Sequence, residues 1–593
     1  MEKPSMSEQH GHHEHSPSAW QPQQPQPDPS QQWPAPPPPI WPAPQHRQPT
    51  SASAPQAQVN QQQGHPQHQY TYPSQSGGYG HGQGPAAMQP EPPRAAPRLP
   101  AGRTSNRRRF LLGVGAALPV VGALGFLASR LGRSTSNQAG GPGNGGTDPD
   151  LYNPSSLPTA AQNPNAITTA DVRALIASAN TALKSRDEKS FVAAYSSGAT
   201  AKQASRMFVN IGKFDFDFLE YQLIGDGTRE FGSGTGTTLG VDVALVHQVS
   251  GVDVAHVAMW YRWELSKQGA SAPLVIESVT GSPSLHMGGA KYVYYPAPWD
   301  SSYDITVIKQ GNAILCAETP ADAALMKKHA AEAVAAIQNN QDGWASGGGK
   351  SGQLAGALMM AAHTRDDFYK WWSGSANQYG NEAGLTIPLI TADAMASGSP
   401  IMAFGGSRIT LDVTTSFFTV DRGGDSVISI LQHEDAHKLT FPLLSAAQSS
   451  VPNWVVEGFA DYMATRTIAG GLKAYFRIPD IKSFAAGRTA TGVKWDGTLP
   501  DDGEVYDNAD ATVESGSYGL ATMAYYYIAS IKGLPGVIAF LQANYQAPAT
   551  NDGTENGPDN LAGAFQSVLG MSQDAFVAGW LGFIKSQIGV SPA

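Results

Sequence analysis

Residues 426–439 read SVISILQHEDAHKL, and the interpretation of the second half of the chain starts from this stretch. Its apolar residues recur at the spacing of one helix face, which predicts an α-helix. His433 and His437 are four residues apart and therefore lie on the same side of that helix. Two imidazoles one turn apart can bind a single metal ion, and Glu434 can take a proton from a water molecule that the ion polarises. The alternative at this point is a surface helix with incidental histidines.

A second amphipathic helix is predicted within residues 452–466, PNWVVEGFADYMATR. Glu457 follows His437 by 20 residues, which is enough chain for a loop and a return past the first helix, so its carboxylate is the candidate third ligand. Two histidines and one glutamate leave the fourth tetrahedral position open for water, as a catalytic zinc requires. Asp461, one turn further, is expected to accept an N–H from a ligand histidine and fix its tautomer. For both acids the alternative is a solvated helix face.

The motif HEDAH, followed at this distance by WVVEGFADY, resembles the gluzincin zinc metallopeptidases of peptidase MA type, the thermolysin-like and aminopeptidase-like superfamily. The resemblance covers about residues 350–588. It implies one Zn²⁺ per chain with ligands His433, His437 and Glu457, and Glu434 as the general base. It also implies an edge strand that pairs with the substrate backbone, for which residues 408–415, RITLDVTT, are the candidate.

Two further residues matter for this resemblance. Asp435 stands where relatives often carry an apolar or hydroxyl residue, and if it faces the site its charge is expected to perturb Glu434. Gluzincins also use a tyrosine or histidine to stabilise the oxyanion of the tetrahedral intermediate, and no histidine follows Glu457 in this chain. Tyr518 is the candidate catalytic tyrosine, and Tyr506 is the alternative.

The C-terminal residues are expected to form a helical bundle. Tyr525, Tyr526 and Tyr527 are predicted to be core residues of the helix that carries Tyr518. Three more helices are expected at residues 536–544, 561–569 and 572–588, with Phe576, Trp580 and Phe583 in the core.

Residues 167–285 begin with helical signals, because Thr168 or Thr169 caps an apolar run and a second run covers residues 187–195. The remainder is predicted to be strand. Helices followed by a curved antiparallel sheet resemble the NTF2-like or cystatin-like α+β cone, which can bind a ligand or act as a spacer. The expected strands lie at residues 214–219, 238–249, 252–265 and 273–279.

The region 300–593 is predicted to be mixed α/β with added helices, so the fold class of the chain is multidomain α+β. A glycine-rich and aromatic junction at residues 287–300 leads into it. Strands are expected at 303–309 and 313–317, followed by a helix at 321–338. Within these elements, His329 and Cys316 are expected to be buried structural residues.

Residues 1–106 are predicted to be a disordered Pro/Gln-rich cytoplasmic tail. The first 100 residues contain 23 of the 44 prolines and 8 of the 15 histidines, together with long glutamine runs, and they offer little apolar surface to bury. Trp20, Trp33 and Trp41 alternate with prolines and could bind an SH3- or WW-like partner. An unstructured spacer is the alternative.

Residues 107–133 are predicted to be a transmembrane signal anchor. Residues 110–128 carry no charge and at 1.5 Å per residue reach about 28 Å, close to the roughly 30 Å of a bilayer core. Six arginines precede this span from residue 94 onward and two follow it, which places the N-terminus in the cytoplasm and the later domains outside. Residues 134–166 are predicted to form a flexible linker. The segment NRRRFLL at 106–112 also resembles a twin-arginine signal, so cleavage is the alternative.

The formal net charge is −10 with 15% charged residues, which leaves no basic footprint for nucleic acid. The sole cysteine excludes an intrachain disulfide. These observations lead to the hypothesis of a membrane-anchored, extracytoplasmic zinc peptidase that acts on a peptide or protein. Two alternatives stay open. One is a catalytically inactive gluzincin-like binding or scaffolding protein of the cell envelope, and the other is a latent peptidase whose cleft is covered by residues 167–285.

Overall fold

The computed structural model describes residues 166–224, 238–282, 293–350, 356–372, 382–397, 403–420, 425–444, 451–467, 471–505, 510–546 and 560–592. The predicted tail, the predicted anchor, almost all of the linker, and Tyr506 lie outside the described residues. The described residues form a mixed α/β structure with two sheets, which confirms the predicted combination of helices and sheets.

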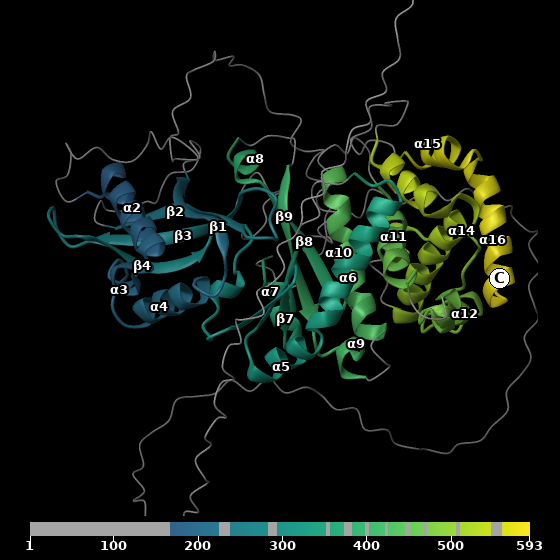
Figure 1. The fold of residues 1–593 in the computed structure, drawn as a ribbon, viewed down its shortest axis with the longest axis horizontal. Helices are drawn as coiled ribbons and strands as arrows, with labels where there is room; N and C mark the ends of the chain where they lie inside the picture. The colour runs from purple at the N-terminus through teal and green to yellow at the C-terminus, as the bar shows by residue number, and fades with distance from the viewer. Residues whose placement is uncertain are drawn as a thin grey trace, which may run out of the picture. The chain divides into compact units, whose positions relative to one another are not determined.

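The first described part consists of three helices followed by a four-stranded antiparallel sheet in the order β1-β2-β3-β4 (Figure 1). The first helix begins as predicted, because the Thr168 side chain accepts from the Asp171 N–H and the Asp171 carboxylate accepts from the Thr168 N–H. The elements are α2 (Thr169–Ser185), α3 (Glu188–Val192), α4 (Ala199–Ile211), β1 (Phe216–Ile224), β2 (Thr238–Val249), β3 (Val257–Lys267) and β4 (Leu274–Gly281).

Helix α4 corrects the prediction that only strands follow residue 195. Its buried residues Ala204, Met207 and Ile211 recur at helix spacing and pack into the same core as the sheet. The predicted strand at 252–265 also begins later than expected, at Val257, because residues 250–256 form the turn between β2 and β3.

The second sheet has five strands in the order β5-β6-β7-β9-β8. Strands β6, β7 and β9 are parallel, while β5 and β8 pair antiparallel at the two edges. Its two faces belong to different cores. In β6, for example, Leu315 packs with α6 and α10, whereas Ile314 and Cys316 pack with the first described part. The strands are β5 (Thr306–Gln310), β6 (Ala313–Ala317), β7 (Ala357–Ala362), β8 (Gly384–Ile390) and β9 (Phe404–Asp412).

The predicted edge strand at 408–415 is wrong. Strand β9 lies between β7 and β8, and the edge strand beside the HEDAH helix is β8. The polar residues of β9 that suggested a solvent-facing side are buried, since Arg408 and Thr410 are both fully enclosed. Arg408 is accommodated because it pairs with buried Asp253, and this pairing was not visible in the local pattern.

Two helices replace the single one predicted at 321–338: α5 (Pro320–Lys328) and α6 (Ala330–Ser346). They meet at His329, which is buried as expected. Its Nδ1 contacts the Glu332 carboxylate, and its ring meets Phe418 edge to face. Cys316 is also fully buried, as expected.

Helices α10 to α16 and the short turns between them form the remainder of the described chain (Figure 1). The residues predicted to fill this core are divided: Tyr525, Phe576 and Trp580 are buried, whereas Tyr526, Tyr527 and Phe583 are half-buried and pack against the core. Ile584, next to Phe583, takes the buried position. The elements here and near the second sheet are η4 (Pro298–Asp300), α7 (Arg365–Lys370), α8 (Ala392–Ser397), α9 (Ser416–Thr419), α10 (Asp425–Leu444), α11 (Asn453–Thr465), η5 (Gly471–Ala474), α12 (Ile478–Ala485), α13 (Asp502–Val505), α14 (Ala511–Asn544), α15 (Leu561–Ala564), η6 (Phe565–Leu569) and α16 (Gln573–Ile588).

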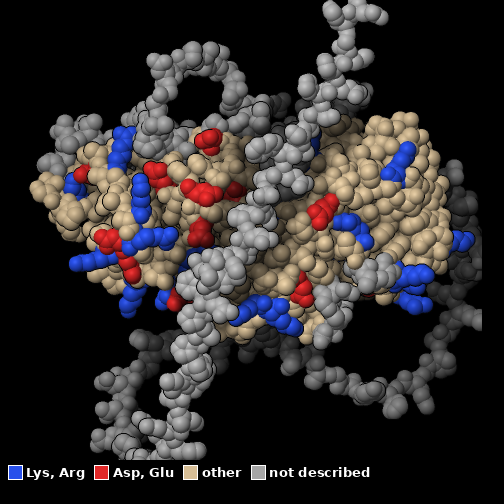
Figure 2. Space-filling view, in the orientation of Figure 1, with Lys and Arg blue, Asp and Glu red and all other residues tan. Residues whose placement is uncertain are grey.

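Among the described helices, α14 is long and apolar enough by length and composition to cross a membrane. It is interrupted at Gly533, where φ is 66°, and its apolar residues belong to the core that also contains α11, α12 and α16. The same composition therefore suits a core helix. On the face of the described residues seen in Figure 2, acidic and basic side chains are interspersed among a larger area of uncharged residues.

Candidate metal centre

Helices α10 and α11 bring together the three side chains that the sequence predicts as ligands. α10 carries His433 and His437 on one side, and α11 returns along it and contributes Glu457. One potential ligand atom from each residue lies within 4.8 Å of the other two, and all three side chains are buried. The structure therefore brings Glu457 together with the paired histidines.

The spacing of the three atoms fits one small ion. Nε2 of His433 lies 3.1 Å from Nε2 of His437 and 3.2 Å from Oε2 of Glu457, and the His437–Glu457 separation is 3.5 Å. A tetrahedral zinc site with ligand distances of about 2.0–2.1 Å requires ligand atoms about 3.3–3.4 Å apart. Two imidazole nitrogens and one carboxylate oxygen are also a donor set that zinc accepts. The residues present therefore fit such an ion.

Asp461 orients the first histidine, as predicted. Its Oδ1 lies 2.7 Å from Nδ1 of His433, so an N–H at Nδ1 donates to the carboxylate and Nε2 is left as the atom that faces the site. The other oxygen, Oδ2, accepts from the Tyr475 hydroxyl at 2.7 Å and from Nε of Arg477 at 3.0 Å. Tyr475 and Arg477 were not predicted as site residues, because no motif marks them and only the fold brings them beside α11.

Charge is concentrated in this buried site. Burial raises the pKa of Glu457, but both histidines outweigh that effect and hold it well below its usual range. Burial lowers the pKa of His433, but its hydrogen bonds to Asp461 and Glu457 raise it to about 10. Burial likewise opposes ionisation of Asp461, whereas the Arg477 charge and the His433 hydrogen bond lower its pKa to about 2. The carboxylates therefore stabilise positive charge beside the ring nitrogens. A bound cation can supply that charge in place of protons.

Glu434 lies against the edge strand β8. The Thr386 hydroxyl is 2.7 Å from Oε2 of Glu434 and 2.8 Å from its main-chain oxygen. At Gly384 a Cβ would overlap the Glu434 carboxylate, so β8 approaches this side chain as closely as glycine allows. Burial raises the pKa of Glu434, while the neighbouring histidines lower it. Sequence reasoning missed both β8 residues because β8 itself was not predicted.

Tyr518 approaches the site from α14. Its ring centroid is 6.4 Å from that of His433, and the side chain is buried. The guanidinium carbon of Arg477 lies 4.7 Å from the centre of the Tyr518 ring. Burial raises the pKa of Tyr518 well above its ordinary value, so the hydroxyl keeps its proton and can donate it in a hydrogen bond. The candidate tyrosine therefore lies near His433, one of the three potential ligands.

Asp435 points away from this centre. It is fully buried on the opposite side of α10, where it pairs with Lys438 at 2.6 Å and accepts from the Asn340 amide of α6 at 3.0 Å. The condition under which it was expected to perturb Glu434, that it faces the site, is not met. Its contacts instead join α10 to α6.

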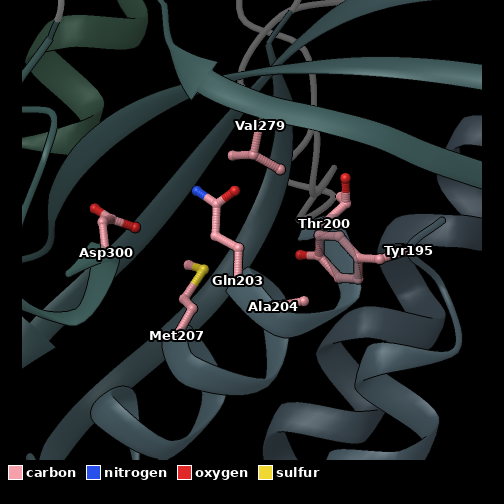
Figure 3. Close-up of a pocket in the computed structure, with 7 residues that line it drawn as sticks. All are labelled: Tyr195, Thr200, Gln203, Ala204, Met207, Val279 and Asp300. Atoms are coloured by element: carbon pink, nitrogen blue, oxygen red, sulfur yellow. The ribbon is translucent and has the colours of Figure 1, made fainter. Parts of the chain in front are cut away.

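A separate small pocket lies in the first described part, between α4 and β4 (Figure 3). The Tyr195 ring, Met207 and Asp300 line it. Burial raises the pKa of Asp300 to about 7, although hydrogen bonds from the Ala297 N–H and the Tyr261 hydroxyl favour the charged form. None of the residues lining this pocket was predicted as a functional residue.

No protein-family model matches the chain, and no curated protein matches it.

Proposed function

We propose that this chain is a zinc-dependent peptidase of the gluzincin type. The observation that carries the proposal is the convergence of His433, His437 and Glu457 on one point at separations of 3.1–3.5 Å, in a site that also holds the Glu434 carboxylate. Three protein ligands leave one tetrahedral position for water or substrate, which distinguishes catalytic from structural zinc sites.

Each residue of the site has a role in this proposal. A zinc ion held by the three ligands would supply Lewis-acid polarisation of the scissile carbonyl and of the attacking water. Glu434 accepts a proton from that water at its carboxylate and later gives it to the leaving amine. The Thr386 hydroxyl fixes the Glu434 carboxylate in place. The Tyr518 hydroxyl donates a hydrogen bond to the oxygen on which negative charge develops.

The substrate in this proposal is an extended peptide that adds to the free edge of β8. Among the described strands, β8 pairs with β9 alone, so its second edge is not paired with another described strand. Gly384 of that strand lies directly beside Glu434, which brings a peptide paired with β8 next to the general base.

The location and the accessory part of the protein are also proposals. The uncharged span at 110–128, with six arginines before it and two after it, supports a single-pass membrane protein whose peptidase domain is extracytoplasmic. The order of three helices and an antiparallel sheet in residues 166–282 supports an NTF2-like or cystatin-like assignment. This part contacts the second sheet at the bridge between Val257 and Thr391. Thr391 follows the C-terminal end of β8, whereas Gly384 is at its N-terminal end. This arrangement favours an accessory role over occlusion of the site.

The variant Glu434→Gln tests the proposal. The amide cannot accept the proton from water, so cleavage of a peptide library is expected to fall by about three orders of magnitude or more, because general acid–base and nucleophile activation are both lost. Bound zinc, measured by elemental analysis, is expected to stay at the wild-type level because Glu434 is not a ligand.

Lys585→Gln on α16 serves as the matched control, because it also removes one charge but lies far along the chain from the site. Full peptidase activity in Glu434→Gln would overturn the mechanism. A wild-type protein that binds zinc but cleaves no peptide in the library would favour the binding or scaffolding alternative.

A further inference from the structure

Arg477 contacts both halves of the proposed catalytic machinery. It stands just before α12, and its side chain is 18% exposed. Its Nε donates to Oδ2 of Asp461 at 3.0 Å, and its guanidinium carbon lies 4.7 Å from the centre of the Tyr518 ring. One planar cation thus touches the carboxylate that orients a metal ligand and the ring of the candidate oxyanion donor.

On the Asp461 side, Arg477 is one of several hydrogen-bond donors to a carboxylate whose two oxygens are both engaged. Oδ1 is occupied by Nδ1 of His433, and Oδ2 receives Arg477, the Tyr475 hydroxyl at 2.7 Å and the Thr522 hydroxyl at 3.3 Å. These hydrogen bonds restrict rotation of the Asp461 carboxylate. Because Oδ1 then holds the Nδ1–H of His433, the orientation of Nε2 toward the metal position depends on the same set of contacts.

On the Tyr518 side, the guanidinium packs on the face of the phenol ring. It also lies 4.9 Å from the centre of the Phe476 ring, so two aromatic rings flank it. Its Nη1 donates to Ser515 Oγ at 3.2 Å, one turn before Tyr518 on α14. Ser515 in turn donates to Asp480 at 2.7 Å, which ties the start of α12 to α14. The guanidinium plane therefore determines where the Tyr518 ring, and hence its hydroxyl, can lie.

We propose that Arg477 is a positioning residue that couples the orientation of the His433 ligand nitrogen to the placement of Tyr518. This inference rests on the proposed function. Its two contacts make different chemical demands: the link to Asp461 requires a positive charge that donates a hydrogen bond, whereas the link to Tyr518 requires a flat guanidinium. Substitutions can therefore separate them.

The experiment compares Arg477→Lys and Arg477→Met with Tyr475→Phe in the full-length protein. Zinc affinity is measured by competition with a chromophoric chelator, and the cobalt-substituted protein gives an absorption spectrum that reports ligand geometry. Arg477→Met is expected to lower metal affinity by about 10–100-fold, as losses in the layer around metal ligands typically do, and to lower kcat as well. Arg477→Lys is expected to keep metal affinity within about threefold and to lower kcat by about tenfold with KM unchanged.

Tyr475→Phe removes a donor to Asp461 without touching Tyr518, so it is expected to weaken metal binding with a smaller effect on kcat at saturating zinc. A double-mutant cycle completes the separation. If the lysine acts through Tyr518, Arg477→Lys combined with Tyr518→Phe is expected to be no slower than Tyr518→Phe alone. Arg466→Met is the matched control. This partly buried arginine donates to the Asn339 main-chain oxygen, in a contact between α11 and α6 away from the site.

The inference is overturned if Arg477→Met changes metal affinity, cobalt spectrum and kcat no more than Arg466→Met does, or if the Arg477→Lys and Tyr518→Phe effects simply add. If the variants give such results while the wild-type protein binds zinc and cleaves peptide, the proposed function is left intact. A wild-type protein that neither binds zinc nor cleaves peptide would remove both.

Discussion

Asp435 and Asp461 show how the position of a carboxylate decides its role. Both are buried acids beside the histidine pair, yet Asp461 holds Nδ1 of His433 while Asp435 pairs with Lys438 on the far side of α10. Spacing predicts the first role, because residue 461 follows Glu457 by one turn. It does not predict the second, because Asp435 also accepts from Asn340 of α6, which is 95 residues away in the chain.

The two acids should therefore respond differently to the same substitution. Asp461→Asn is expected to lower zinc affinity by about 10–100-fold, because the amide orients His433 less firmly. Asp435→Asn is expected to leave zinc affinity within about threefold and to lower the thermal unfolding midpoint, because it leaves Lys438 without its buried charge partner. Chelator competition and thermal unfolding of both variants check this. Equal losses of zinc affinity would contradict the assignment.

Asp300 gives a prediction about pH. Burial raises its pKa to about 7 in the folded chain, from 3.8 in the unfolded chain, so the folded state binds a proton more tightly. The stability that this proton contributes is fully present below about pH 4 and is lost as the pH rises through 7. Asp300→Asn lacks this titration and can still accept from the Tyr261 hydroxyl.

The check is the difference in unfolding midpoint between wild type and Asp300→Asn, measured from pH 4 to pH 8. The wild type is expected to lose stability relative to the variant as the pH rises. Asp304→Asn is the control of opposite sign, because Lys213 lowers the pKa of Asp304 and that stabilisation is lost as the pH falls through the acid range. A pH-independent difference for Asp300→Asn would refute the prediction.

The proposed ligand residues could be identified from sequence because each lies on a helix whose period is visible in the chain. Gly384, Thr386 and Arg477 were not predictable, because they reach the site from segments between 50 residues before and 43 residues after Glu434. Nothing in the local pattern marks a threonine or an arginine as a partner of a distant carboxylate. Such residues become visible only when the tertiary contacts are known.

Among the elements, β8 has the largest influence on the site that the sequence did not reveal. It forms the edge of the second sheet, and its Gly384 passes beside Glu434. The alternating pattern of β9 had suggested that β9 was the edge strand. That pattern was misleading because Arg408 and Thr410 are polar residues that the fold buries. Alternation indicates a solvent-facing side only when the polar side chains have no buried partner.

Gly384→Ala tests the contact between β8 and Glu434. The added methyl group would overlap the carboxylate, so Glu434, the proposed general base, must move. A displacement of about 1 Å at a catalytic group can cost about 100-fold, and we expect a loss of this size in kcat with zinc content unchanged. Gly582→Ala on α16 is the control, because its Cβ would have no neighbour within 4 Å. Wild-type turnover in Gly384→Ala would show that β8 does not constrain the base.

Helix prediction succeeded where apolar spacing was strong and failed at interruptions. The segments that became α11 and α16 showed clear periodicity, and both are helices close to the expected bounds. The break at His329 was missed because α5 and α6 have a continuous helical pattern and the interruption coincides with a buried histidine. Helix α4 was missed because the strand-rich segment that follows it dominated the interpretation.

In the molecule as a whole, the first part and the second sheet share one hydrophobic core. Residues of β2 and β3 belong to the same cluster as Cys316, Met360 and Leu389 of the second sheet. A fully buried ion pair crosses this junction: both terminal nitrogens of Arg408 contact Asp253, at 2.6 and 2.8 Å. One alternative from the sequence is that residues 167–285 cover the cleft of a latent peptidase. Removing all residues before 350 would not test it, because such a fragment also lacks β5, β6 and α6.

Asp253→Asn tests this junction. It leaves the Arg408 charge buried without a carboxylate, and we expect a loss of about 3–5 kcal/mol in the free energy of unfolding. Denaturant unfolding followed by fluorescence measures it. The double variant Asp253→Asn with Arg408→Met removes the stranded charge, so its loss is expected to be smaller than the sum of the two single losses. Additive losses would indicate that the pair is not coupled.

The proposed function depends on two imidazoles and a carboxylate from α10 and α11 holding a single zinc ion. Elemental analysis of the purified full-length protein tests this by counting the zinc ions bound per chain. We expect one zinc per wild-type chain, and a large loss of zinc on replacing Glu457 with alanine while the far-UV circular dichroism is retained. A folded wild-type protein that retains no zinc when the metal is supplied, or an alanine variant that retains it fully, would contradict the metal site and the peptidase function that depends on it.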